Sequence, residues 1–276
     1  MGKLNLQMYS FLDGTMNDSK ENLKLTAEMG FSGVELFGPN LEIPAEEMKG
    51  LLADLKLEAV SLHAPKTDMV EQLIPYAVAL GMKYIGIGME VMKDDAAVHA
   101  FTARLNEIGA KCKESGLNLT YHNHTQEFLP CEDRTVYEVL MDETNPEYVE
   151  FELDAGWAAA AGVDPLMLLQ KYSGRIPLVH VKESDKVIGP QPVMDFDAIE
   201  KDENGQPIFT DEMKAKMERD KQINCKACEG LVDWKKLKEV ADHNGTKAYI
   251  VERESSVEGT RLERLKSDIN AYKSIF

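Results

Sequence analysis

The chain reads Ala27-Glu28-Met29-Gly30 and soon afterwards Val34-Glu35-Leu36, a helix that ends in glycine and an apolar strand that follows it. The pattern returns as Ala79-Leu80-Gly81 before Tyr84-Ile85-Gly86-Ile87, as Glu114-Ser115-Gly116 before Leu117-Asn118-Leu119, and as Asp242-His243-Asn244-Gly245 before Ala248-Tyr249-Ile250-Val251. Glycine readily takes the left-handed conformation that caps a helix, so each copy is typical of an αβ loop. Repetition of this unit predicts a parallel sheet.

Apolar segments alternate with helical patterns along the whole chain. We expect strands near 4–11, 33–38, 58–64, 84–89, 117–124, 149–154, 176–182 and 248–254. The clearest helix carries Val98, Phe101, Leu105, Ile108 and Cys112 at steps of three and four residues. Because (βα)8 barrels run to about 250 residues, the 276 residues predict one α/β domain over 1–276, a (β/α)8 TIM barrel. An open doubly wound sheet is the alternative, but residues 10–15 lack the glycine-rich phosphate turn that it would call for.

One segment interrupts this rhythm. Residues 185–232 separate the seventh expected strand from the next helix, far more than the few residues of an ordinary βα loop. Its middle, 211–221, is charged and favours a helix. We therefore expect an insertion, called the insertion below, that serves as a lid, as a subunit interface in a homo-oligomer or as a surface excursion.

Charge and composition narrow the possible partners. The 48 acidic and 31 basic side chains give a net charge of −17, which would repel nucleic acid and an anionic membrane alike. A neutral sugar fits this balance better than a fully anionic substrate. The sequence shows no signal peptide and no apolar run of the ~18 residues that span a bilayer, so we expect a cytoplasmic protein. Its 4 cysteines are too few for a disulfide framework.

Polar side chains stand where the expected strands end. Asp154, His180 and Glu252 end three consecutive strands, and Glu127 lies just beyond the fifth. In a barrel, the C-terminal strand ends build the active site. Carboxylate and imidazole ligands suit a divalent cation, and the oxygens favour Mn²⁺ or Mg²⁺, with Co²⁺ or Zn²⁺ also possible. His122 or His124, nearer the strand end, could take the place of Glu127.

The alternation of side chains along a strand identifies further candidates. Residues two apart share a direction, so His180 and Lys182 point together, as do His122 and His124, and His63 shares its face with Ser61. Glu35 could bind substrate or pair with Lys or Arg. Trp157 could stack on a sugar or pack against the helices.

A metal with open coordination positions would polarise a carbonyl and an adjacent hydroxyl of a bound sugar. A carboxylate beside it could then take the proton from the carbon between them. These residues therefore indicate isomerisation or epimerisation of a small-molecule sugar or sugar phosphate, through a metal-bound enediolate.

Several stretches together are similar to a known family. They are Gly33-Val34-Glu35-Leu36, Ser61-Leu62-His63-Ala64-Pro65, Tyr121-His122-Asn123-His124 with Glu127-Phe128, Glu152-Leu153-Asp154 with Trp157, and Val179-His180-Val181-Lys182. The chain resembles the sugar phosphate isomerase/epimerase family of the xylose isomerase-like TIM barrel superfamily. The resemblance implies Glu127, Asp154, His180 and Glu252 as metal ligands, with Glu127 and Glu252 as the proton-transfer groups. It also implies that His63, His122, His124, Trp157 and Lys182 bind or orient the sugar.

Two other functions are compatible with the same residues. The first is a lyase on a keto sugar, which would dehydrate an inosose or cleave a 3-keto glycoside, because it begins with the same proton abstraction. The second is a barrel without catalysis that binds sugar or acts as a partner subunit. Endonuclease-like DNA repair would need a basic groove, which this charge balance disfavours.

Overall fold

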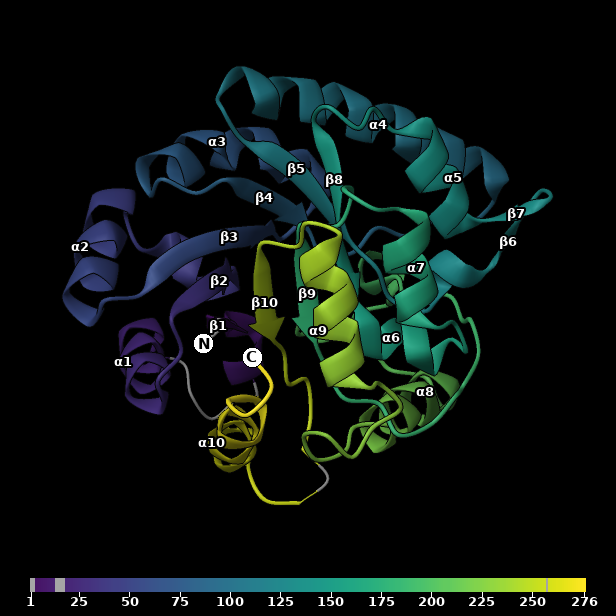
Figure 1. Ribbon diagram of the computed structural model, residues 1–276. Helices are drawn as coiled ribbons and strands as arrows, with labels where there is room; N and C mark the ends of the chain where they lie inside the picture. The colour runs from purple at the N-terminus through teal and green to yellow at the C-terminus, as the bar shows by residue number, and fades with distance from the viewer. Residues whose placement is uncertain (1–2, 13–17, 257) are drawn as a thin grey trace.

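The computed structural model describes residues 3–12, 18–256 and 258–276. Of the six-residue stretch 10–15 considered above, it describes residues 10–12. Within these residues, eight parallel strands close a barrel in the order β1-β10-β9-β8-β5-β4-β3-β2 (Figure 1). They are β1 (Leu4–Gln7), β2 (Gly33–Phe37), β3 (Glu58–Ala64), β4 (Tyr84–Ile87), β5 (Asn118–His122), β8 (Val149–Asp154), β9 (Leu178–Val181) and β10 (Ala248–Val251). The chain is therefore a single-domain TIM barrel, as the alternation predicted.

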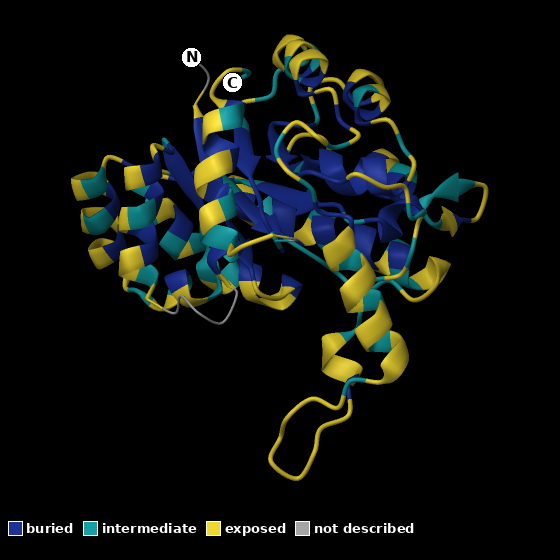
Figure 2. Cartoon of the chain, turned by 90° about the horizontal axis from the view of Figure 1, so that it is seen from below, coloured by how far each residue is buried: buried dark blue, intermediate teal, exposed yellow. Residues whose placement is uncertain are grey.

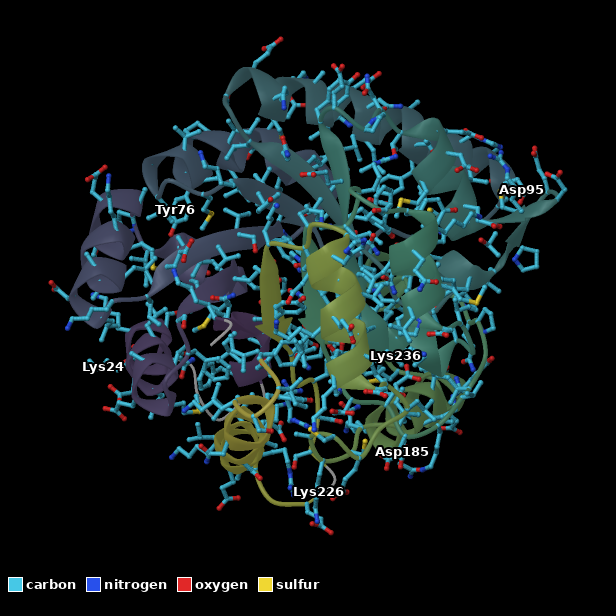
Figure 3. All side chains as sticks on the ribbon, viewed as in Figure 1. Lys24, Tyr76, Asp95, Asp185, Lys226 and Lys236 are labelled. Carbon is cyan, nitrogen blue, oxygen red and sulfur yellow. The ribbon has the colours of Figure 1, made fainter. Side chains whose placement is uncertain are left out.

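Helices surround the strands (Figure 1). The α-helices are α1 (Ser19–Met29), α2 (Ala45–Leu55), α3 (Val70–Ala79), α4 (Asp95–Glu114), α5 (Val136–Glu143), α6 (Ala155–Ala160), α7 (Pro165–Lys171), α8 (Asp211–Gln222), α9 (Trp234–His243) and α10 (Arg261–Tyr272). Short 3-10 helices are η1 (Met8–Phe11), η2 (Gly38–Glu42), η3 (Thr67–Met69), η4 (Gln126–Phe128) and η5 (Phe196–Ala198). The apolar stripe predicted for α4 is buried, whereas labelled charged side chains such as Lys24 and Lys236 lie on the outer surface (Figure 3).

The expected strands are all present, but several end earlier than the apolar pattern suggested. The first was expected to reach residue 11, yet β1 ends at Gln7 because the chain turns into η1, where the Gln7 side chain accepts a hydrogen bond from the Tyr9 amide. A small hairpin of β6 (Pro130–Cys131) and β7 (Arg134–Thr135) was not expected. Gly30, which caps α1, has a φ of 88°, the left-handed conformation inferred from the repeated pattern.

Register between neighbouring strands positions the lumen side chains. Asp154 on β8 pairs with His180 on β9, and His122 on β5 pairs with Glu152 on β8. Residues in register on adjacent parallel strands point to the same face of a sheet. Polar side chains from these strands therefore meet inside the barrel, while the apolar residues between them pack against the helices.

The segment from the end of β9 to the start of α9 contains η5 and α8. Much of it is exposed and extends away from the barrel (Figure 2), and no residue of α8 is buried. No helix in the described ranges has the length and apolar character needed to cross a bilayer.

Candidate metal centre

Four buried side chains converge at the C-terminal end of the barrel. His122, Asp154, His180 and Glu252 each offer a ligand atom, and these atoms lie within 4.8 Å of one another. Asp154 Oδ2 is 3.8 Å from His122 Nε2 and 4.0 Å from His180 Nδ1, and His180 Nδ1 is 3.7 Å from Glu252 Oε2. Ligands about 2.1 Å from a shared cation stand roughly 3–3.5 Å apart, so a small inward shift would suit one ion. We call these four residues the outer group.

The outer group also passes a test of hydrogen bonding. Asp154 Oδ2, His180 Nδ1 and Glu252 Oε2 are buried, and among the described residues they have no hydrogen-bond partner. A buried polar atom without a partner costs about 1–3 kcal/mol, and a bound ion can satisfy such an atom. The residues present therefore fit a divalent cation.

Burial and neighbouring charges shift the pKa values of the outer group in different directions. Burial and the neighbouring His180 lower the pKa of His122 to about 3, so its imidazole is neutral, the form that binds metals. Burial raises the pKa of Asp154 to about 8. Burial also lowers the pKa of His180, but Glu152 and Glu35 outweigh it and hold this pKa well above its ordinary value. In the metal-free chain, the carboxylates of Glu152 and Glu35 thus favour the protonated form of the His180 imidazole.

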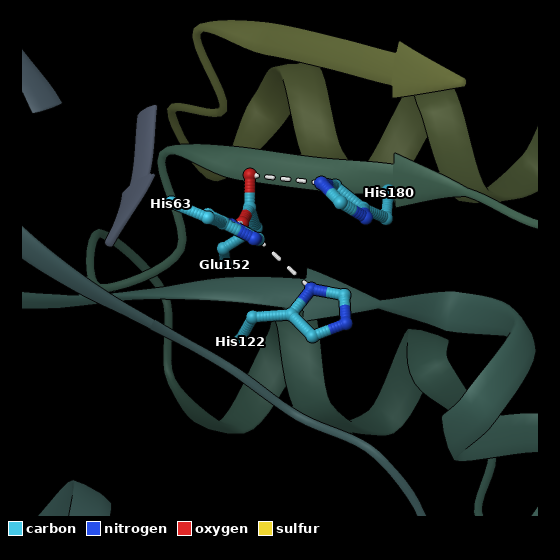
Figure 4. Close-up of side chains that lie close together, drawn as sticks. All are labelled: His63, His122, Glu152 and His180. Carbon is cyan, nitrogen blue, oxygen red and sulfur yellow. Dashed lines mark hydrogen bonds and ion pairs between the residues drawn. The ribbon is translucent and has the colours of Figure 1, made fainter. Parts of the chain in front are cut away.

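Two more buried carboxylates lie near these imidazoles, Glu152 among His63, His122 and His180 (Figure 4), and Glu35 beside His180. Glu152 Oε2 lies 2.5 Å from His63 Nε2 and 3.7 Å from His122 Nδ1, and its Oε1 lies 3.2 Å from His180 Nε2. Glu35 Oε1 lies 2.8 Å from His180 Nε2. Ligand histidines commonly hold their second ring nitrogen against a carboxylate, which fixes the ring and raises its basicity. Glu35 stands in that position for His180, whereas Glu152 lies near both imidazoles of the outer group, with His122 Nδ1 and Glu152 Oε1 lacking a hydrogen-bond partner among the described residues.

Glu127 lies elsewhere, and this differs from the sequence prediction of a ligand at that position. Its carboxylate accepts hydrogen bonds from the Tyr121 hydroxyl at 2.7 Å, the His124 amide at 2.7 Å and the Gln126 side chain at 2.9 Å. The fourth place in the outer group is taken by His122, the alternative that the sequence left open. Glu127 lies in η4, beyond the end of β5, where its own hydrogen bonds set its direction.

Glu35 also differs from its expected place. It was a candidate for substrate binding or for pairing with Lys or Arg, but it is fully buried, accepts hydrogen bonds from Gln7 and Ser61, and pairs with a histidine, His180. Sequence reasoning assigned no role to Glu152. The signal was present, since Glu152 is two residues before Asp154 on the same strand and so shares its face.

The other candidates lie beside the outer group. Lys182 Nζ is 2.8 Å from Glu254 Oε2 and 3.8 Å from Glu252 Oε2, and it lies over the Trp157 ring, 4.7 Å from the centroid. The Trp157 indole donates a hydrogen bond to Glu254 at 3.2 Å, and its ring is 5.7 Å from that of His124. Gly156 permits this approach, because a Cβ there would clash with the Lys182 backbone carbonyl.

A cavity of about 500 Å³ opens beside the outer group. His63, His122, His124, Trp157 and Glu252 line it on the barrel side. Part of the opposite wall comes from the insertion, namely Gln191, Pro192, Val193, Met194 and Phe196 together with the α8 residues Lys216, Met217, Asp220 and Lys221. A substrate in this cavity could thus reach His122 and Glu252 of the outer group while it contacts the insertion.

Comparisons with known proteins agree with this architecture. Residues 23–275 match the family model described as xylose isomerase-like TIM barrel. An inosose dehydratase from Bacillus cereus (strain AH820) is 37% identical over 79 residues, which cover 29% of this chain and only 26% of that relative. A sugar phosphate isomerase/epimerase from Parabacteroides distasonis superposes with a TM-score of 0.75 at 19% identity, over 100% of this chain and 96% of that one. The IolI protein, whose structure holds a zinc atom, superposes with a TM-score of 0.71 at 12% identity, over 99% of both chains.

Proposed function

Because the chain belongs to the xylose isomerase-like TIM barrel family, we propose that it is a divalent-metal-dependent enzyme that isomerises or epimerises a sugar or keto sugar. One observation carries this proposal. Three ligand atoms, on Asp154, His180 and Glu252, are buried without a hydrogen-bond partner in the described chain, and Glu252 lines an open cavity. Buried polar atoms without a hydrogen-bond partner are uncommon in folded proteins, and they often belong to functional sites.

His122, Asp154, His180 and Glu252 would hold the metal. When bound, the cation would polarise a carbonyl and a neighbouring hydroxyl of the substrate. Two imidazoles with two carboxylates suit Mn²⁺, Co²⁺ or Zn²⁺ better than Mg²⁺, which prefers an all-oxygen shell. The zinc atom in the similar IolI structure supports a transition metal here.

The proton steps fall to side chains at the cavity. Glu252 is the candidate base. Burial raises its pKa, but His180 and Lys182 lower that pKa by a larger amount, so the carboxylate is ionised. His124 is the candidate second group, because burial lowers its pKa to about 4 and its Nδ1 has no hydrogen-bond partner among the described residues. Lys182 would stabilise negative charge that develops on a substrate oxygen. His124 thus takes the role first assigned to Glu127.

Turnover should carry solvent deuterium into the substrate. In D₂O, the metal-loaded protein is expected to place deuterium on the carbon next to the carbonyl of an accepted ketose, because the abstracted proton exchanges with solvent. Nuclear magnetic resonance of a ketose panel measures this, with chelator-treated protein as the control. Absence of exchange across the panel, together with no affinity for Mn²⁺ or Zn²⁺, would instead favour a barrel that binds sugar without catalysis.

A lyase is the second candidate, because the 79-residue match is to an inosose dehydratase. Dehydration of a keto-inositol starts with the same proton abstraction but ends with loss of a hydroxyl from the neighbouring carbon as water. Incubation with a keto-inositol separates the two reactions, since a dehydratase yields an unsaturated ketone that absorbs ultraviolet light. An isomerase or epimerase yields a product of unchanged mass.

Replacement of Glu152 by glutamine is expected to weaken metal binding about 10–100-fold, because its charge lies close to both imidazoles of the outer group and groups around the ligands contribute on that scale. Titration of the metal-free protein with Zn²⁺ and a competing chelator measures the change. Glu150→Gln is the matched control: Glu150 lies on the same strand, but its carboxylate accepts a hydrogen bond from Asn118. Equal Zn²⁺ affinities for the two variants would show that Glu152 does not support the ligands.

A further inference from the structure

We propose that Glu254 is a positioning residue for the outer group, because it holds the Lys182 ammonium away from Glu252. Glu254 lies in the loop that follows β10, and its side chain lines the cavity. Without Glu254, the ammonium would pair with Glu252 and compete with the cation for that carboxylate. The inference rests on the proposed function, in which Glu252 is both a metal ligand and the base.

The two oxygens of the Glu254 carboxylate have different partners. Oε2 is 2.8 Å from Lys182 Nζ, and Oε1 accepts a hydrogen bond from the Trp157 indole at 3.2 Å. Lys182 directly follows β9 and Trp157 lies on α6, so this carboxylate links segments that are far apart in the sequence. The bond from Trp157 fixes the direction of the carboxylate, and this direction places its second oxygen beside the ammonium.

No hydrogen bond fixes the Lys182 ammonium itself. The side chain is buried, and its Nζ has no hydrogen-bond partner among the described residues. The ammonium lies instead beside Glu254 and 4.7 Å from the centroid of the Trp157 ring, and both contacts attract it through its charge. The balance of the charges around Lys182 therefore determines where the ammonium lies.

Glu252 competes with Glu254 for this ammonium. Glu252 Oε2 is 3.8 Å from Lys182 Nζ, farther than the Glu254 oxygen. The same Glu252 oxygen is 3.7 Å from His180 Nδ1 and has no hydrogen-bond partner among the described residues, as expected of a metal ligand. Because opposite charges attract most strongly where water is excluded, loss of the Glu254 charge would draw the ammonium onto the oxygen that the cation needs.

A double-mutant cycle on Zn²⁺ affinity tests this role. Glu254→Gln removes the charge but keeps an oxygen for the Trp157 indole, and it should weaken Zn²⁺ binding about tenfold. In the Lys182→Met background, the same substitution should change the affinity by less than about threefold, because no ammonium is left to move onto Glu252. Titration of the metal-free proteins with Zn²⁺ and a competing chelator measures both effects. A purely structural role of Glu254 would not depend on Lys182.

Glu258→Gln is the matched control. Glu258 lies in the same loop, and its carboxylate is 3.4 Å from Lys226 Nζ and 3.5 Å from Arg264 Nη2, but it is not among the residues that line the cavity. This substitution should leave the Zn²⁺ affinity unchanged in both backgrounds. The Glu254 side chain is 22% exposed, and a methionine fills most of the space of Lys182, so all variants should fold. Circular dichroism checks the fold.

Equal effects of Glu254→Gln in the two backgrounds would overturn the positioning role, as would an unchanged Zn²⁺ affinity in the single variant. These titrations do not depend on turnover. Coupling between the two substitutions without deuterium exchange would reject the proposed chemistry but support the role of Glu254. Exchange without coupling would do the reverse, and a native chain that binds no Zn²⁺ would overturn both proposals.

Discussion

Asp154→Asn is expected to remove the bound metal and lower kcat on the order of 10³-fold, about 4 kcal/mol of transition-state stabilisation. A Lewis-acidic cation contributes several kcal/mol to reactions of this type. The substitution is nearly isosteric and spares the fold, because Asp154 Oδ1 caps α6 by accepting a hydrogen bond from the Trp157 amide at 2.6 Å, and an asparagine oxygen can do the same. Only Oδ2, which has no hydrogen-bond partner among the described residues, loses its charge.

Metal content by mass spectrometry and the deuterium-exchange rate measure these two effects, while circular dichroism reports on the fold. Asp164→Asn is the matched control, since Asp164 caps α7 through the Leu166 amide and is exposed. It should keep full metal content and activity. A folded Asp154→Asn protein with normal metal content would rule out the outer group as the metal site.

His122→Ala should mainly weaken metal binding, whereas Glu127→Gln should mainly lower the stability of the fold. Loss of His122 removes one of four ligands, so metal affinity is expected to fall on the order of 10²-fold or more. Glu127→Gln should leave metal binding nearly unchanged but lower the free energy of unfolding by about 1–3 kcal/mol. The reason is that Tyr121 and His124 each donate to a different oxygen of Glu127, and a glutamine would turn its own N–H donors towards one of them.

Zn²⁺ titration and chemical denaturation of both variants measure the two quantities. Because His122 is buried, His122→Gln serves as a second variant that fills most of the same space. If Glu127→Gln loses the metal and both His122 variants keep it, the ligand set implied by the family resemblance is right and the outer group defined by the structure is not.

Much of the fold follows from patterns that are local in the sequence. Gly30 caps a helix in a conformation that other residues resist, and the stripe from Val98 to Cys112 makes one face of α4 apolar. The helix cap and the apolar stripe each depend on residues only a few positions apart, so both can be predicted from the sequence alone. Strand ends were less certain, because the chain leaves a strand where a particular side chain offers a new partner, as Gln7 does at the start of η1.

The sequence by itself determined the barrel and brought Asp154, His180 and Glu252 to one mouth of it, since alternation within a strand and the common direction of parallel strands fix where such side chains point. Only the tertiary structure showed that His122, and not Glu127, lies among these side chains, because Glu127 lies past the strand end and turns towards Tyr121 and His124. It also placed Glu152 next to the imidazoles of His122 and His180, and the insertion along the cavity. The physical reason is that alternation specifies a direction only inside a regular strand. Beyond it, the contacts made by the folded chain determine where each side chain goes.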